Sequence, residues 1–205
     1  MKTRDLLLIV GLSFANLSDG VNNVRCEVVQ ENLEQKLNGA YQEVVDSYYV
    51  PEDDLILILL GDNQKLYVLD RNGSLKKEYE ISTAVNGFGN KNGSKKTPEG
   101  VHRIAYKYGT DAKYGTIFDA KKRMNGVFKS NSGRALITSR IMTIEGVEPD
   151  NQNTYFRSIY IHGTNKENEI GRPASHGCIR MKNRDIIELY DLVKQGTYIN
   201  IVNTY

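Results

Sequence analysis

Two reactive side chains, His162 and Cys178, constrain the fold of this chain more than any other feature. A thiol attacks a carbonyl carbon well only as a thiolate, and an imidazole within hydrogen-bond reach favours that form in a thiolate–imidazolium pair. The segment between them holds Gly171 and Pro173, which favour turns, so the chain can double back and return antiparallel to the segment with the histidine. The sequence therefore predicts that two neighbouring segments bring a nucleophile and a base together.

The residues that lead to His162 have the alternation of a β-strand. Ile159 and Ile161 fall on one face, and Tyr160 and His162 fall on the other. A strand would thus deliver the imidazole at its end. A lone histidine there would more often be structural, and it is the cysteine motif that favours a catalytic base.

Residues 175–181 have the sequence SHGCIRM. Gly177 lacks a Cβ, so the backbone can turn tightly and direct the amides of residues 177 and 178 at the oxygen of a tetrahedral intermediate. In an extended segment Arg180 shares a face with Cys178, where its guanidinium suits a substrate carboxylate. A surface ion pair is the structural alternative for Arg180.

This motif, together with HGT at 162–164 and IG at 170–171, resembles the signature of the L,D-transpeptidases with the YkuD catalytic domain. The resemblance runs from about Leu55 to the carboxyl end and includes TPEGVHRI at 97–104, where His102 stands in place of a commoner aromatic residue. It implies Cys178 as nucleophile, His162 as general base and acid, and a backbone carbonyl at or near Gly163 as the third catalytic group. The residues expected to bind substrate are Arg180, Ser175, His176, Gly177, Gly163 and Thr164.

The resemblance also implies a two-step acyl transfer on peptidoglycan stem peptides, through a thioester on Cys178. The residues alone indicate acyl transfer, and water in place of an amine acceptor would make a peptidase. Two alternatives stay open: a cell-wall binding protein without turnover, and a secreted cysteine hydrolase of another family, in which Asn165 or Asn183 would orient the histidine. This chemistry needs no cofactor, and the sequence signals none.

Apolar periodicity changes at Pro51. Before it, residues 26–50 repeat apolar positions every three or four residues, which predicts an amphipathic helix that Asn38-Gly39 could interrupt. After it, short β-rich runs at 55–60, 65–70, 75–85, 97–104, 135–145 and 198–202 predict an all-β sandwich or barrel-like fold, with a hairpin turn at 71–74. The predicted class is mainly β: a YkuD-like β-sandwich with an N-terminal helix and a helix following the cysteine motif.

Two other segments of this domain have distinct patterns. Residues 109–134 contain few apolar runs and predict a long irregular loop. Residues 183–194 predict a helix capped by Asn183 and closed by Gly196, with Ile186, Ile187, Tyr190 and Val193 on its inner face.

The first residues have the pattern of a secretory signal peptide, because basic residues at positions 2 and 4 precede an apolar run from Leu6 to Phe14. That run is too short to span a bilayer, and an N-terminal helix of the folded domain is the structural alternative. The predicted organisation is a signal peptide at 1–20, a helical segment at 21–52 and a catalytic domain at 53–205, exported to the periplasm or cell wall.

A formal net charge of +2, with scattered lysines and arginines, gives no support for nucleic-acid binding. The basic run at 121–123 is typical of a solvated loop. Zinc bound by His102, His162, His176 and Cys178 is disfavoured, since the cysteine already has a nucleophilic explanation. A disulfide between Cys26 and Cys178 is the remaining alternative and would block the nucleophile.

Overall fold

The computed structural model describes residues 20–128 and 133–203, with side chains from Val29 onward. The predicted signal peptide, except Gly20, lies outside the described residues. The strands are β1 (Ile56–Leu60), β2 (Lys65–Leu69), β3 (Leu75–Ser82), β4 (Gly100–Tyr108), β5 (Thr116–Asp119), β6 (Lys122–Val127), β7 (Ile137–Gly146), β8 (Tyr160–Thr164), β9 (Ile179–Met181) and β10 (Tyr198–Val202). The helices are α1 (Gly20–Ser47), the 3-10 helix η1 (Glu167–Glu169) and α2 (Asn183–Leu192). No helix in the described ranges is long and apolar enough to cross a membrane.

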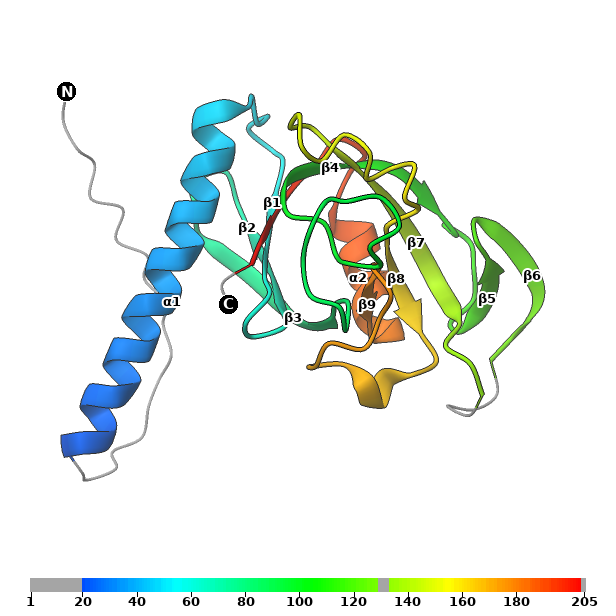
Figure 1. The fold of residues 1–205 in the computed structure, drawn as a ribbon, viewed down its shortest axis with the longest axis horizontal. Helices are drawn as coiled ribbons and strands as arrows, with labels where there is room; N and C mark the ends of the chain where they lie inside the picture. The colour runs from blue at the N-terminus through cyan, green and yellow to red at the C-terminus, as the bar shows by residue number, and fades with distance from the viewer. Residues whose placement is uncertain (1–19, 129–132, 204–205) are drawn as a thin grey trace.

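The strands form one ten-stranded sheet that closes on itself. Its order is β4-β10-β1-β2-β3-β9-β8-β7-β5-β6, and β4 also pairs with β7. The eight strands from β4 to β7 therefore make a ring, while β5 and β6 form a hairpin that extends from β7 at the end of the molecule away from α1 (Figure 1). The predicted class, mainly β with an N-terminal helix and a helix that follows the cysteine motif, is confirmed.

The sequence of β1, ILILL, explains how the ring is covered on both faces. Leu57 and Leu59 point into the ring, where apolar residues from all eight strands meet Ile186 and Leu189 of α2. Ile56, Ile58 and Leu60 point outward and pack beneath α1. A strand that is buried on both faces needs a continuous apolar run, which β1 has.

The N-terminal helix is fixed to the outer face of the ring. Leu37, Tyr41 and Val44 are buried at helical spacing. The Asn200 amide on β10 donates to the Ala40 carbonyl at 3.0 Å. The helix is continuous through residues 38 and 39, so the predicted interruption is absent.

Three sequence predictions were wrong. Residues 109–134 contain the β5–β6 hairpin, whose second strand is entirely exposed and so has no apolar alternation. Helix α2 begins at Asn183 and ends at Leu192, and Asn183 is not its cap, because its side chain is bonded to β7 and β8 instead. Strands β8 and β9 are parallel, not antiparallel.

The parallel pairing has a physical reason in the connection between the two strands. Parallel neighbours need a crossover of about a dozen residues or more, and residues 165–178 provide it. This crossover passes along β3, where Gly171 N–H donates to the Ile81 carbonyl and Ser175 N–H donates to the Thr83 carbonyl. Strand β9 consequently enters between β3 and β8 in the direction of β8.

Candidate active site

Cys178 and His162 are carried by neighbouring segments and face the same side of the sheet. In the β8–β9 pairing, His162 lies opposite Arg180 and Ile161 lies opposite Ile179. The two isoleucines point into the core of the ring. At alternating positions, His162, Arg180 and Cys178 therefore point outward. The cysteine and the histidine are diagonal neighbours on this face.

The imidazole of His162 is buried and held in one tautomer. Its Nδ1 lies 2.7 Å from the carbonyl oxygen of Gly163. A carbonyl only accepts, so Nδ1 carries the proton and Nε2 is an acceptor. Burial lowers the pKa of His162 to about 4; the hydrogen bond to the Gly163 carbonyl acts in the opposite direction, and the charge of Arg180 lowers the pKa further. The imidazole is therefore neutral at neutral pH, as a general base must be.

The Cys178 thiol is free and partly exposed, so the alternative disulfide with Cys26 is not formed. It donates a long hydrogen bond of 3.6 Å to the carbonyl of Ser158. Burial raises the pKa of the Cys178 thiol, while the backbone hydrogen bond from Tyr160 and the charge of Arg180 lower it less. Burial disfavours the charged form of each group. The thiolate–imidazolium pair stays a prediction.

Ser158 holds the thiol through an unusual backbone conformation. Its φ is 57°, in the left-handed region that residues other than glycine seldom adopt. Such strain, on the order of 1 kcal/mol, is often found at functional sites. The sequence analysis missed Ser158, and a serine gives no signal for this conformation.

Buried contacts fix the loop that precedes Cys178. The Ser175 hydroxyl donates to the Cys178 carbonyl at 2.6 Å and accepts from the Gly177 N–H at 3.2 Å, while Thr97 donates to the Gly177 carbonyl at 3.1 Å. Gly177 has φ 128°, and a Cβ there would lie 2.9 Å from Ile159. Ser175 and Gly177 thus shape the loop. The Gly177 amide, one of the two predicted oxyanion donors, is bonded to the Ser175 hydroxyl in this structure.

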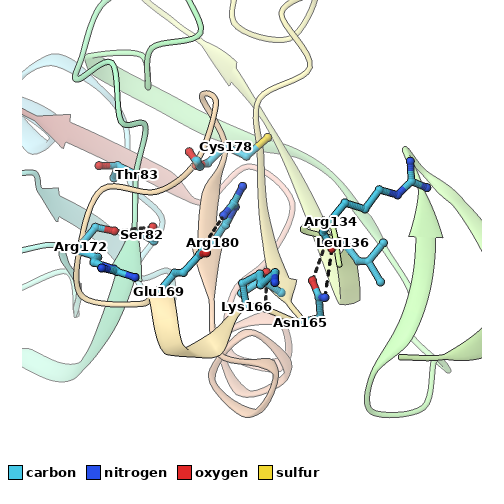
Figure 2. Close-up of polar contacts among 12 residues, drawn as sticks. Ser82, Thr83, Arg134, Leu136, Asn165, Lys166, Glu169, Arg172, Cys178 and Arg180 are labelled. Atoms are coloured by element: carbon cyan, nitrogen blue, oxygen red, sulfur yellow. Dashed lines mark hydrogen bonds and ion pairs between the residues drawn. The ribbon is translucent and has the colours of Figure 1, made fainter. Parts of the chain in front are cut away.

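Arg180 forms a mostly buried ion pair. Its Nη1 lies 3.1 Å from Oε2 of Glu169 in η1, and the arginine side chain is only 9% exposed. Figure 2 shows Glu169 beside the guanidinium and Cys178 on the loop that leads into the same strand. Arg180 therefore does form an ion pair, as the structural alternative predicted, but this pair is mostly buried instead of lying at the surface. A substrate carboxylate at Arg180 stays a prediction, and it would share the guanidinium with Glu169.

Gly163 and Thr164 are buried against Asn183 of α2. The Asn183 amide donates to the Thr164 carbonyl at 2.7 Å, and its Oδ1 accepts from the hydroxyls of Thr138 and Ser139 at 2.6 and 2.5 Å. A Cβ on Gly163 would lie 2.6 Å from the Thr138 carbonyl and 2.9 Å from the Asn183 Oδ1. Glycine is therefore required where α2 packs beneath His162. Direct substrate contact by these residues stays a prediction.

Neither candidate asparagine orients the imidazole of His162, because the Gly163 carbonyl occupies its Nδ1. Asn165 accepts from the Leu136 amide at 2.7 Å and ties the residues before β7 to the end of β8 (Figure 2). Asn183 makes the contacts described above. A cysteine hydrolase with an orienting asparagine thus loses its support.

The other two histidines differ in exposure. His176 is exposed. His102 is a buried strand histidine, with Nδ1 2.9 Å from the Gly100 carbonyl and Nε2 3.0 Å from the Thr154 hydroxyl. Within the described part of the chain, no three His, Cys, Asp or Glu side chains are grouped to hold a metal ion.

A family model described as the L,D-transpeptidase catalytic domain, YkuD, matches residues 53–201, well over half of the chain. The chain belongs to this family. The match begins within the residues that link α1 to β1, and it includes every candidate site residue. Helix α1 precedes the matched region.

Curated relatives of this L,D-transpeptidase-family chain match it over shorter segments. The putative L,D-transpeptidase YkuD of Bacillus licheniformis is 54% identical over 41 residues, which are 20% of this chain and 25% of the relative. The putative L,D-transpeptidase YqjB of Bacillus subtilis is 36% identical over 75 residues, 31% of this chain and 43% of the relative. The matched segments thus span less than half of these relatives.

Solved structures of L,D-transpeptidases resemble this chain distantly. An L,D-transpeptidase from Mycobacterium smegmatis gives a TM-score of 0.48 at 14% identity, over 73% of this chain and 58% of that one. The L,D-transpeptidase (residues 123–326) from Xylanimonas cellulosilytica gives 0.47 at 17% identity, over 80% and 77%.

Proposed function

We propose that this L,D-transpeptidase-family protein transfers acyl groups of peptidoglycan stem peptides through a thioester on Cys178. The observation that supports this most directly is the hydrogen bond from His162 Nδ1 to the Gly163 carbonyl. It leaves Nε2 as a proton acceptor on the face that carries the thiol. The family match supports the reaction class and the substrate class.

In the first step, Cys178 attacks the carbonyl carbon of the peptide bond that precedes a terminal D-amino acid. The thiol gives up its hydrogen bond to the Ser158 carbonyl. Its proton passes to Nε2 of His162 as the C–S bond forms. The imidazolium then gives this proton to the leaving nitrogen as the C–N bond breaks. Proton transfer by a placed imidazole contributes on the order of 10²- to 10⁴-fold in rate. A thioester and a free D-amino acid result.

In the second step, an amine of a neighbouring stem peptide attacks the thioester carbon. His162 takes a proton from the attacking nitrogen and returns one to the departing sulfur of Cys178. A new C–N bond forms as the C–S bond breaks, which creates a crosslink. Water as the acceptor would instead release a shortened stem peptide.

A cell-wall substrate requires that the protein leave the cytoplasm. The basic and apolar pattern of residues 1–20 is that of a secretory signal peptide. We therefore propose export to the periplasm or cell wall, which fractionation of cells that express the tagged full chain would test. Retention of the protein with the cytoplasmic fraction would contradict it.

The reaction is tested by incubating the protein with disaccharide tetrapeptides and identifying the products by mass spectrometry. We expect loss of the terminal D-amino acid and formation of crosslinked dimers. Cys178→Ala should abolish both products, and Cys26→Ala is the matched control that removes the other thiol. Unchanged products in Cys178→Ala would eliminate the mechanism.

The same experiment separates the alternatives. Shortened monomers without dimers would identify a peptidase. Tight binding of the tetrapeptide without products, and without a covalent adduct after carbapenem treatment, would identify a cell-wall binding protein.

A further inference from the structure

The turn of the β5–β6 hairpin directs Lys121 onto three tyrosine rings. Its ammonium lies 4.6 Å from the ring centre of Tyr155, 5.8 Å from that of Tyr160 and 6.0 Å from that of Tyr108. It also donates a 3.3 Å hydrogen bond to the Tyr155 hydroxyl. A cation within about 6 Å of an aromatic face is attracted to it. Lys121 is thus held in one place and is not the solvated loop lysine that the sequence predicted.

One of these rings adjoins the nucleophile. Tyr160 precedes Ile161 and Cys178 precedes Ile179, and these two isoleucines are paired across β8 and β9. Tyr160 and Cys178 therefore lie opposite each other with their side chains outward. Cys178 packs against the apolar cluster that contains Tyr160. Cys178 and Lys121 thus share Tyr160 as a neighbour.

Arg180 and Lys121 differ in their partners. Arg180 is paired with Glu169. For Lys121, in contrast, no carboxylate oxygen of the described residues lies within the 4.0 Å of an ion pair. Partial burial lowers the pKa of Lys121, but the Tyr155 hydrogen bond and the three tyrosines raise it more, so the net shift is upward. Aromatic rings attract the cation without cancelling its charge.

We infer that Lys121 binds the terminal carboxylate of the donor peptide, positioned by Tyr108, Tyr155 and Tyr160. The inference rests on the proposed function and names the group that the donor must carry. The carboxylate of the leaving D-amino acid is attached to the carbon next to the scissile nitrogen. An ammonium that binds this group therefore selects donors that end in a free carboxylate over donors that continue or end in an amide.

The experiment compares two donors that differ only at this group: a tetrapeptide with a free terminal carboxylate and its terminal amide. Thioester formation and release of the leaving group are followed for wild type, Lys121→Met and Lys121→Arg. Lys122→Met is the matched control, because it removes the same charge from an adjacent, exposed position. The melting temperature of each variant shows whether loss of the Lys121 contacts with the tyrosines destabilises the protein.

A charge-assisted hydrogen bond contributes roughly 1.5–3 kcal/mol, which corresponds to about a 10- to 100-fold change. We expect Lys121→Met to lower kcat/KM by that factor for the carboxylate donor, mainly through KM, and to leave the amide donor nearly unchanged. Lys121→Arg should retain most of the activity, and Lys122→Met should resemble wild type.

Two results would overturn the inference. Equal losses with both donors would make Lys121 a structural anchor of the hairpin, and an unchanged preference for the carboxylate would exclude its contact with that group. Failure of the proposed function looks different, since wild type would then form no Cys178 thioester with either donor.

Discussion

Arg180 affects both residues of the proposed catalytic pair, but it favours the charged form of Cys178 and the neutral form of His162. Its positive charge lowers the pKa of the Cys178 thiol, which favours the thiolate, and lowers the pKa of His162, which disfavours the imidazolium. Both effects help the first step, because sulfur must lose a proton and the imidazolium must give it to a leaving nitrogen. The Glu169 carboxylate moderates this charge.

We therefore predict that Arg180→Met raises both pKa values. The rate of thioester formation depends on neutral His162, so its acid limb in wild type should lie near pH 4. In Arg180→Met this limb should move to higher pH, and alkylation of Cys178 should need a higher pH. Initial rates of donor acylation and of iodoacetamide labelling from pH 3 to 10 measure both.

Arg184→Met is the matched control for Arg180→Met, because it removes an exposed cation from the first turn of α2. Its pH profile should match that of wild type. An acid limb that stays in place in Arg180→Met would show that burial alone sets the pKa of His162.

At the scale of secondary-structure elements, one asparagine joins α2 to the strands beneath the site. Asn183 is bonded to Thr138 and Ser139 of β7, to Thr164 of β8 and to Glu167 of η1. Gly163, whose carbonyl orients the His162 imidazole, packs against the same side chain. A change at residue 183 should therefore reach the chemistry as well as the fold.

We predict that Asn183→Ala lowers the free energy of unfolding by about 2–4 kcal/mol, since it leaves several buried polar groups without partners. It should also lower kcat for thioester formation, with a smaller effect on KM, because His162 loses its fixed position. Urea denaturation and steady-state kinetics measure the two effects.

Asn200→Ala is the matched control for Asn183→Ala. Asn200 is equally buried but bonds to Ala40 and Glu43 of α1. Asn200→Ala should lower the free energy of unfolding by about 1–2 kcal/mol without a change in kcat. If Asn183→Ala also left kcat unchanged, Asn183 would have no role in positioning His162.

Elements with a strong local signal could be predicted from the sequence. The continuous apolar run of β1 and the Asn72-Gly73 turn between β2 and β3 gave correct strands and a correct hairpin. The hairpin with the exposed β6 was missed because KRMNGV buries nothing. The direction of β9 was missed because turn-forming residues do not distinguish a reversal from a crossover.

In the candidate site, too, the residues with a local sequence signal could be predicted and those without one could not. Cys178 and His162 stand in a recognisable motif, so sequence alone could nominate them. The contacts of Ser158, Glu169 and Lys121 depend on a backbone dihedral angle or on segments far apart in the chain. No local pattern encodes such contacts.

For the molecule as a whole, closure of the ring separates the surfaces that form the apolar cores from the surface that carries the candidate site. The interior and the face under α1 are apolar, while the outward face of β8 and β9 carries Cys178, His162 and Arg180. The β5–β6 hairpin, which is outside the ring, supplies Lys121 to that face. The peripheral hairpin thus places Lys121 against Tyr160 without contributing residues to the core inside the ring.

Two buried histidines make the stability of the whole molecule depend on pH. Burial lowers the pKa values of His102 and His162 to about 4, whereas a histidine in an unfolded chain titrates near 6.5. Between these pH values the unfolded chain binds protons that the folded chain does not. The free energy of unfolding should therefore be highest above pH 6.5 and fall as the pH approaches 4.

We predict that His102→Gln removes one of these two contributions. The variant should be less stable than wild type at pH 7, because a buried residue with two hydrogen bonds is replaced, but the difference should shrink towards pH 4. Carboxylates titrate alike in both proteins, so the difference isolates His102. Urea denaturation at pH 7, 6, 5 and 4 measures it, with the exposed His176→Gln as the matched control. A difference that stays constant with pH would mean that His102 keeps an ordinary pKa despite its burial.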